Sequence, residues 1–182
     1  GQMRLEEIPA FARDVLEQAD SLLIVCNKKD EAAKLYRKFS DSGFRCHHLS
    51  AAMCMAHRRV VLDALETALE DLKSAPEGSR EKVLCVSTQV MEAGVDISFQ
   101  RVIRLSAGMD SVVQSAGRCN RNGESDSPAP VYLVQCRDEN LAKLTDIQRG
   151  KDATESLLAQ YSRCPAAFQE DLFSKTSIDA YY

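Results

Sequence analysis

The sequence predicts an α/β domain in which helices cover a mostly parallel β-sheet. Short apolar runs rich in Val, Ile and Leu alternate along the chain with segments of helical periodicity. Most of these runs are apolar at successive positions, which is typical of strands whose two faces are both covered. The chain has 182 residues, of which 45% are hydrophobic. This is enough for one ordinary domain with a substantial core.

Five of the apolar runs have the length and composition of buried strands. They are residues 22–26, 45–49, 83–87, 102–105 and 131–135. Because parallel strands need long crossover connections, we expect helices between them.

Two crossover helices follow from the spacing of apolar residues. The first lies between the first two strands, where Asn27 can cap its start and Gly43 lies near its end. Its apolar residues are Ala32, Leu35, Tyr36 and Phe39. The second runs over about residues 56–73, with one stripe of Val and Leu, and the polar segment 74–79 ends it.

The remaining segments are less patterned. Residues 124–130, rich in Ser and Pro, predict an exposed loop, and residues after 137 predict helices followed by a tail. We therefore assign residues 1–145 to the sheet-containing unit. Residues 146–182 form a C-terminal helical segment and tail of the same unit.

Composition excludes some classes of protein. The chain has 23 Lys and Arg against 27 Asp and Glu, so nucleic-acid binding must rest on local charge. The seven cysteines form no C-x-x-C pair, which favours buried, reduced thiols. No apolar run approaches the roughly 18 residues of a membrane span, and the start lacks a basic-then-apolar signal. We expect a cytoplasmic protein without a membrane partner.

The first segment with chemical potential directly follows the third predicted strand. It contains Thr88, Gly94 and Asp96. A strand-to-helix turn with a hydroxyl at its lip can hold a phosphate on backbone N–H groups. Alternatively, Thr88 only caps a short helix, Gly94 only supplies a positive φ, and Asp96 only ends a loop.

The second such segment is residues 110–123. Asp110 can cap a helix whose far end delivers Arg118 and Arg121, three residues apart and on one side. Guanidinium groups are always charged and fork-shaped, so this pair suits the oxygens of a transferring phosphoryl group. The alternative is that both arginines face solvent or pair with carboxylates.

Together the two segments resemble a known family. Residues 87–96 (S-T-Q-V-M-E-A-G-V-D) and 114–121 (Q-S-A-G-R-C-N-R) are similar, in order and separation, to helicase motifs V and VI of superfamily 2. Residues 22–27 resemble motif IV. The finer pattern resembles the CRISPR-associated helicase-nuclease of type I systems. Residues 49–58 also resemble that family, with Ala51 and Met55 where Thr and Pro are expected. The resemblance covers roughly residues 21–132.

The resemblance implies a RecA-like three-layer α/β/α domain, the second motor domain of an ATP-dependent helicase. It makes Arg121 the arginine finger that reaches the γ-phosphate, with Arg118 and Gln114 in the same ATP-facing cluster. It also implies that Gly94 lets the backbone approach the nucleotide and that Asp96 contacts the ribose or the coupling network.

The resemblance further implies a nucleic-acid site and partners. Thr88, with Ser50 and Asn27, would contact the phosphates of single-stranded DNA. ATP with magnesium would be held mainly by a first RecA-like domain. Further implied partners are a nuclease domain of the same protein and an RNA-guided CRISPR surveillance complex. The expected function is translocation on foreign DNA in the prokaryotic cytoplasm.

The 182 residues contain no G-x-x-x-x-G-K-S/T phosphate loop, so we expect this chain alone not to hydrolyse ATP. Asp30 and Glu31 mimic the acidic box of a helicase. However, three residues separate Asp30 from the preceding strand, whereas a magnesium-holding Asp should follow it directly. We interpret them as the first turn of a helix. No metal site is predicted at the three histidines, which favour satisfied or exposed positions.

Two other functions remain open from the sequence. The chain could be half of another superfamily 2 helicase, acting in DNA repair or on RNA. It could also be a non-catalytic docking module that keeps the RecA-like fold. The presence of Gln114, Arg118 and Arg121 argues against the second alternative, because a docking module does not need arginines that face a phosphate.

Overall fold

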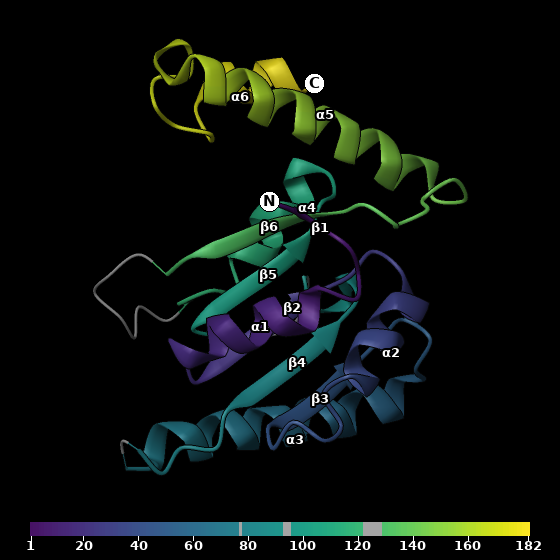
Figure 1. Ribbon diagram of the computed structural model, residues 1–182, viewed down its shortest axis with the longest axis vertical. Helices are drawn as coiled ribbons and strands as arrows, with labels where there is room; N and C mark the ends of the chain where they lie inside the picture. Colours follow the sequence, from purple (N-terminus) through teal and green to yellow (C-terminus); the bar gives the residue numbers. More distant parts are fainter. Residues whose placement is uncertain (77, 93–95, 122–128) are drawn as a thin grey trace.

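The computed structural model describes residues 1–76, 78–92, 96–121 and 129–182 (Figure 1). In this part of the chain one sheet has six parallel strands in the order β1-β6-β5-β2-β4-β3. The strands are β1 (Gln2–Met3), β2 (Ser21–Val25), β3 (Arg45–Leu49), β4 (Val83–Ser87), β5 (Arg101–Leu105) and β6 (Val131–Cys136). All five predicted strands are confirmed to within one residue at each end. β1 was not predicted.

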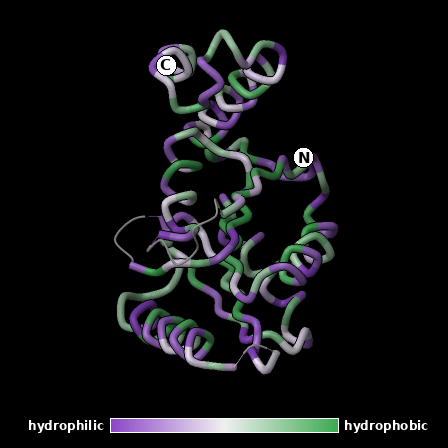
Figure 2. The backbone as a smooth tube through the Cα atoms, turned by 90° about the vertical axis from the view of Figure 1, so that its left-hand side faces the viewer, coloured by the Kyte–Doolittle hydropathy of each residue, from purple (hydrophilic) through white to green (hydrophobic). Residues whose placement is uncertain are grey.

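Helices cover both faces of the sheet, as predicted (Figure 1). α1 (Ile8–Glu17) and α2 (Lys29–Arg37) pack on one face. α3 (Met55–Ser74) and the short 3₁₀ helix η1 (Gln89–Met91) pack on the other. The chain continues through α4 (Met109–Ala116), α5 (Thr145–Arg163), η2 (Pro165–Phe168) and α6 (Lys175–Tyr181). Figures 1 and 2 show α5 and α6 at one end of the long axis.

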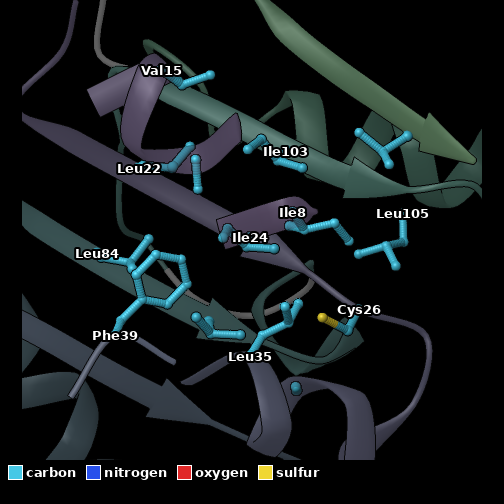
Figure 3. Close-up of a cluster of buried hydrophobic side chains, with 14 of the residues drawn as sticks. Ile8, Val15, Leu22, Ile24, Cys26, Leu35, Phe39, Leu84, Ile103 and Leu105 are labelled. Carbon is cyan, nitrogen blue, oxygen red and sulfur yellow. The ribbon is translucent and has the colours of Figure 1, made fainter. Parts of the chain in front are cut away.

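The alternation of side chains along β2 builds two cores. All five residues of β2 are buried. Leu22 and Ile24 face α1 and α2 (Figure 3), whereas Leu23 and Val25 face α3. Because successive side chains of a strand point to opposite faces, a continuous apolar run is what a doubly covered strand requires. Each such side chain contributes on the order of 1.5–3 kcal/mol when fully buried.

Two predicted helix caps are wrong. The N-cap residue of α2 is Lys28, and the amide of Asn27 instead bonds to Ser106 and Glu139. The N-cap residue of α4 is Gly108, which leaves Asp110 in the first helical turn. For Asn27 the physical reason is that its side chain is engaged by these tertiary partners. Glu31, by contrast, lies in the first turn of α2 as predicted.

The cysteines are only partly buried. Cys26, Cys85 and Cys136 are buried, whereas Cys54 and Cys164 are exposed, so the prediction of burial is wrong for the last two. Burial raises the pKa of the Cys136 thiol to about 12. All seven thiols are unpaired. Among the described helices none combines the length and the apolarity that a membrane span requires.

The C-terminal helices pack against α4. A small third core contains Met109, Leu157 and Phe168. The Met109 N–H donates a hydrogen bond to the Tyr181 hydroxyl (3.1 Å). A Cβ on Gly150 of α5 would lie 2.9 Å from the Gly108 Cα and 3.2 Å from its nitrogen. The segment that leads to the two arginines of interest is therefore braced by residues close to the C-terminal end of the chain.

We expect Gly150→Ala to destabilise the protein by about 1–3 kcal/mol, the usual cost of overpacking. At an exposed helix position the same change stabilises by up to about 1 kcal/mol, so the sign is diagnostic. Urea unfolding measures it, with Ser156→Ala on the exposed side of α5 as the control. Stabilisation by Gly150→Ala would contradict this close packing.

Candidate functional site

The three residues predicted to contact DNA follow three neighbouring strands. Asn27 lies two residues after β2, Ser50 directly after β3 and Thr88 directly after β4. These strands are adjacent in the order β2-β4-β3, and their parallel direction brings their carboxyl ends to one edge of the sheet. The Ala51 N–H donates to the Thr88 hydroxyl (3.2 Å), and the Thr88 N–H donates to the Leu49 carbonyl (3.1 Å). The structure therefore brings the ends of β3 and β4 together.

A cavity of about 840 Å³ opens at this edge. It is lined by Asn27, Lys28, Lys29, Asp30, Ala51, Thr88, Gln89, Val90, Asn140, Ala142, Lys143 and Leu144. Three of these side chains are lysines and one is an aspartate, so the cavity has an excess of positive charge. The predicted DNA residues Asn27 and Thr88 are part of the lining. Ser50 is buried, and its hydroxyl accepts a hydrogen bond from the Ala52 N–H (3.3 Å).

One wall of this cavity was not predicted from the sequence. It is formed by residues 140–144, which connect β6 to α5. The segment carries no recognisable motif. The only sequence signal was its place after a buried strand, because loops at the carboxyl ends of parallel strands meet at one edge. Lys143 is exposed there and faces the same space as the lysines that begin α2.

The two arginines of motif VI differ in their surroundings. α4 ends at Ala116, and both arginines lie beyond it, so the prediction that they share one side of a helix is wrong. Arg118 is 7% exposed, and its Nη2 donates to the main-chain oxygen of Glu92 (3.0 Å). Between the two arginines, Asn120 adopts a left-handed φ of 47°. The chain therefore turns, and Arg121 is left at the surface.

Arg121 connects the two predicted motifs. Its Nε lies 2.9 Å from Oδ1 of Asp96, and the side chains are 41% and 83% exposed. Burial, and secondly the charge of Arg121, lower the pKa of the Arg118 guanidinium, which is consistent with two closely spaced cations. Gln114 lies on the exposed side of α4, and Gly94 lies outside the described residues. The structure thus brings together Arg118, Arg121 and Asp96 of the predicted nucleotide group.

A buried ion pair lies behind this surface. Arg104 of β5 is fully buried, and its Nε lies 2.8 Å from Oε1 of Glu92, close enough for an ion pair although the N–H is not aligned with that oxygen. Arg104 Nη1 donates to Asn27 Oδ1 (2.8 Å) and to the Leu105 carbonyl (2.7 Å). Its Nη2 donates to the Ser111 hydroxyl (2.7 Å). A buried arginine needs such partners to offset the loss of hydration.

The partners of Glu92 complete this network. Ser111 and Ser115, one turn apart on α4, lie 2.7 Å and 2.9 Å from its carboxylate oxygens. The sequence analysis did not identify Glu92 or Arg104 as residues of the site. The signal was Arg104 itself, a charged residue between the apolar residues Ile103 and Leu105 of β5, since such a residue is almost never buried unless it is paired.

Asn27 belongs to this network as well as to the cavity. Its amide nitrogen donates to the Ser106 carbonyl and to Oε1 of Glu139, both at 2.9 Å. Its oxygen accepts from Arg104. Asn27 is 5% exposed, so it is held in the floor of the cavity rather than presented to solvent. Lys151 also approaches Glu139 (3.4 Å).

The all-parallel sheet with helices on both faces defines the class of the fold, which is a RecA-like α/β domain. The chain belongs to the family described as CRISPR-associated nuclease/helicase Cas3, C-terminal, which matches residues 18–124. The family and the RecA-like fold predicted from the sequence are therefore confirmed.

Two curated relatives are CRISPR-associated nuclease/helicase Cas3 proteins. The one from Methanothermobacter thermautotrophicus is 27% identical over 203 aligned residues, which cover 98% of this chain and 23% of the relative. The one from Haloferax volcanii is 43% identical over 85 residues, which cover 45% of this chain and 8% of the relative. The chain thus spans less than a quarter of the length of either protein.

Solved structures share the fold. The T. fusca Cas3-AMPPNP structure has a TM-score of 0.68 at 19% identity and covers 87% of this chain and 20% of its own. The structure of a CRISPR RNA-guided surveillance complex, pre-nicking, contains a chain with a TM-score of 0.61 at 22% identity, covering 86% of this chain and 21% of its own. The DEAD-box protein SrmB of E. coli has a TM-score of 0.52 at 19% identity, covering 74% of each chain.

Proposed function

We propose that this domain is the second motor domain of an ATP-dependent, single-stranded DNA translocase that acts in type I CRISPR interference. The observation that carries the proposal is the exposed Arg121, which pairs with the exposed carboxylate of Asp96 and lies close to Arg118. An anion presented by another domain can compete for such an arginine. The absent phosphate loop assigns ATP and magnesium to that other domain.

Interaction energies favour the exchange of Asp96 for a phosphate as the partner of Arg121. An ion pair between exposed side chains contributes only about 0–1 kcal/mol, so Arg121 can leave Asp96 at little cost. The γ-phosphate of ATP offers several charged oxygens that match the planar guanidinium fork. Arg118 stays anchored to the Glu92 carbonyl and supplies a second positive charge behind Arg121. Solved structures that share this fold are described as T. fusca Cas3-ATP and Cas3-AMPPNP, which supports a nucleotide as ligand of the complete motor.

The cavity at the strand ends is the proposed nucleic-acid site. Lys28, Lys29 and Lys143 surround it with positive charge, and the Thr88 hydroxyl and the apolar side chain of Val90 line it. Phosphates of a single strand would contact the lysines and the hydroxyl, and a base would cover the apolar part. Closing and opening of the two RecA-like domains around ATP would then move the strand past this edge.

The partners follow from the family. The proposed partners are a first RecA-like domain and a nuclease domain of the same protein. An RNA-guided surveillance complex is the third, since a chain with this fold occurs in one. The likeness to a DEAD-box protein shows the fold alone. The competing proposal is a helicase that acts on RNA. The proposed location is the prokaryotic cytoplasm.

We expect Lys143→Glu to weaken binding of single-stranded DNA and to reduce its salt dependence. Each lost phosphate contact lowers the slope of log affinity against log salt by about 0.7 for single strands. Fluorescence anisotropy with a labelled oligonucleotide measures both quantities. Lys175→Glu, on α6 and away from the cavity, introduces the same change of charge as a matched control. Equal loss of affinity in both variants would reject the cavity as the site.

A further inference from the structure

We propose that Glu92 and Arg104 are positioning residues that connect the DNA-facing edge of the domain with the arginines of its nucleotide-facing side. This inference rests on the proposed function, because it assigns a regulatory link within the same motor. Neither residue touches the proposed substrate or nucleotide. Both act through the side chains that they hold.

On the nucleotide side the link is through Glu92. Its main-chain oxygen accepts the Arg118 Nη2 hydrogen bond (3.0 Å), while its carboxylate accepts from Ser111 and Ser115 of α4. The chain that leaves α4 carries both Arg118 and Arg121. A displacement of Glu92 therefore acts on Arg118 directly and on the base of this segment through the two serines.

On the DNA side the link is through Asn27. This residue lines the cavity, and its side-chain oxygen accepts from Arg104 Nη1 (2.8 Å). Both donors of its amide nitrogen are also engaged, with Ser106 and Glu139. A phosphate that entered the cavity and recruited the Asn27 amide would have to replace one of these bonds. That replacement would shift the oxygen that holds Arg104.

The planar guanidinium of Arg104 connects the DNA side with the nucleotide side. Its guanidinium contacts Asn27 on one side and Glu92 and Ser111 on the other. The donors of a guanidinium are fixed in one plane, so a change at one of them is felt at the others. The contacts form one continuous path from Asn27 through Arg104 and Glu92 to Arg118. Such contiguous polar networks can carry coupling between sites.

A purely structural role explains this arrangement less well. Well-packed apolar residues in place of a buried ion pair are often as stable or more stable. The rest of β5 is built in that way, with Val102, Ile103 and Leu105 fully buried. A charged pair with partners just after β2, on β5 and on α4 is therefore better suited to linking these segments than to stabilising the core.

The test uses the protein that carries both RecA-like domains. The readout is the ratio of the ATP hydrolysis rate with single-stranded DNA to the rate without it. Arg104→Lys keeps the buried charge balance but loses the planar fork, and Glu92→Leu with Arg104→Met removes both charges. We expect the ratio to fall by about tenfold in both, a typical coupling factor between linked sites. A merely structural defect would lower both rates together and leave the ratio unchanged.

Two results would overturn the inference. One is an unchanged ratio in either variant when thermal melting shows that it is folded. The other concerns the wild-type chain and needs no variant to fold: the ¹⁵N resonance of Arg104 Nε should shift when single-stranded DNA is added, and an unshifted resonance at saturation contradicts the link. If wild-type hydrolysis ignores DNA, the proposed function itself fails and this inference fails with it. If DNA stimulates ATP hydrolysis by the wild-type protein and by both variants to the same extent, the inference fails but the proposed function stands.

Discussion

Replacing Arg121 with Ala should lower DNA-stimulated ATP hydrolysis by about 10³-fold in the protein that carries both RecA-like domains. The physical reason is that a guanidinium stabilises the charge that develops on the transferring phosphoryl group. Arg121 is exposed and pairs with the exposed carboxylate of Asp96, so it is available for that group. Because its side chain lies at the surface, the variant should remain folded.

The affinity for single-stranded DNA should change little in Arg121→Ala, because the proposed DNA cavity is lined by other residues. Arg163→Ala, at the end of α5, is the matched control for loss of an exposed arginine. Asp96→Ala removes the resting partner of Arg121, and it should leave far more activity than Arg121→Ala. Unchanged turnover in Arg121→Ala would reduce Arg121 to a surface charge and favour the docking-module alternative.

Replacing Arg104 alone with Met should destabilise the protein by about 3–5 kcal/mol, the usual cost of leaving a buried charge without its partner. Glu92 would remain buried with only the hydroxyls of Ser111 and Ser115. The double change of Glu92 to Leu and Arg104 to Met removes both charges and should recover most of that loss. Unfolding in urea measures the difference for each variant.

Arg101→Met is the matched control for this prediction. Arg101 lies on the same strand, is only half-buried, and bonds through its own Nη1 to the Gln100 carbonyl (2.8 Å). We expect its replacement to cost far less than that of Arg104. Equal destabilisation by the two single changes, or a double variant as unstable as Arg104→Met, would show that the ion pair is not what holds these residues in place.

The fold was predictable because its strands carry a strong local signal. β2 and β4 are apolar at nearly every position, and this pattern requires a sheet covered on both faces. β1 could not be predicted, because two residues are too few to show a period. Its pairing with β6 depends on a contact more than 130 residues away along the chain.

The candidate site was predictable only in part. The resemblance placed Asp96 and Arg121 in the same group, and the structure joins them. The pairing of Glu92 with Arg104 could not be predicted from the sequence around either residue, because only the tertiary fold brings Glu92, which follows η1, against Arg104 of β5. Asn27 shows the same limit: it suits a helix cap locally, and tertiary partners use its amide instead. The roles assigned to these residues remain predictions.

The most direct test of the central claim compares ATP hydrolysis by three samples: this chain alone, the phosphate-loop domain alone, and a protein in which the two are joined. The account predicts no turnover by either part and DNA-stimulated turnover by the joined protein, because the catalytic site is shared between the domains. Turnover by this chain alone that Arg121→Ala abolishes would contradict the shared site.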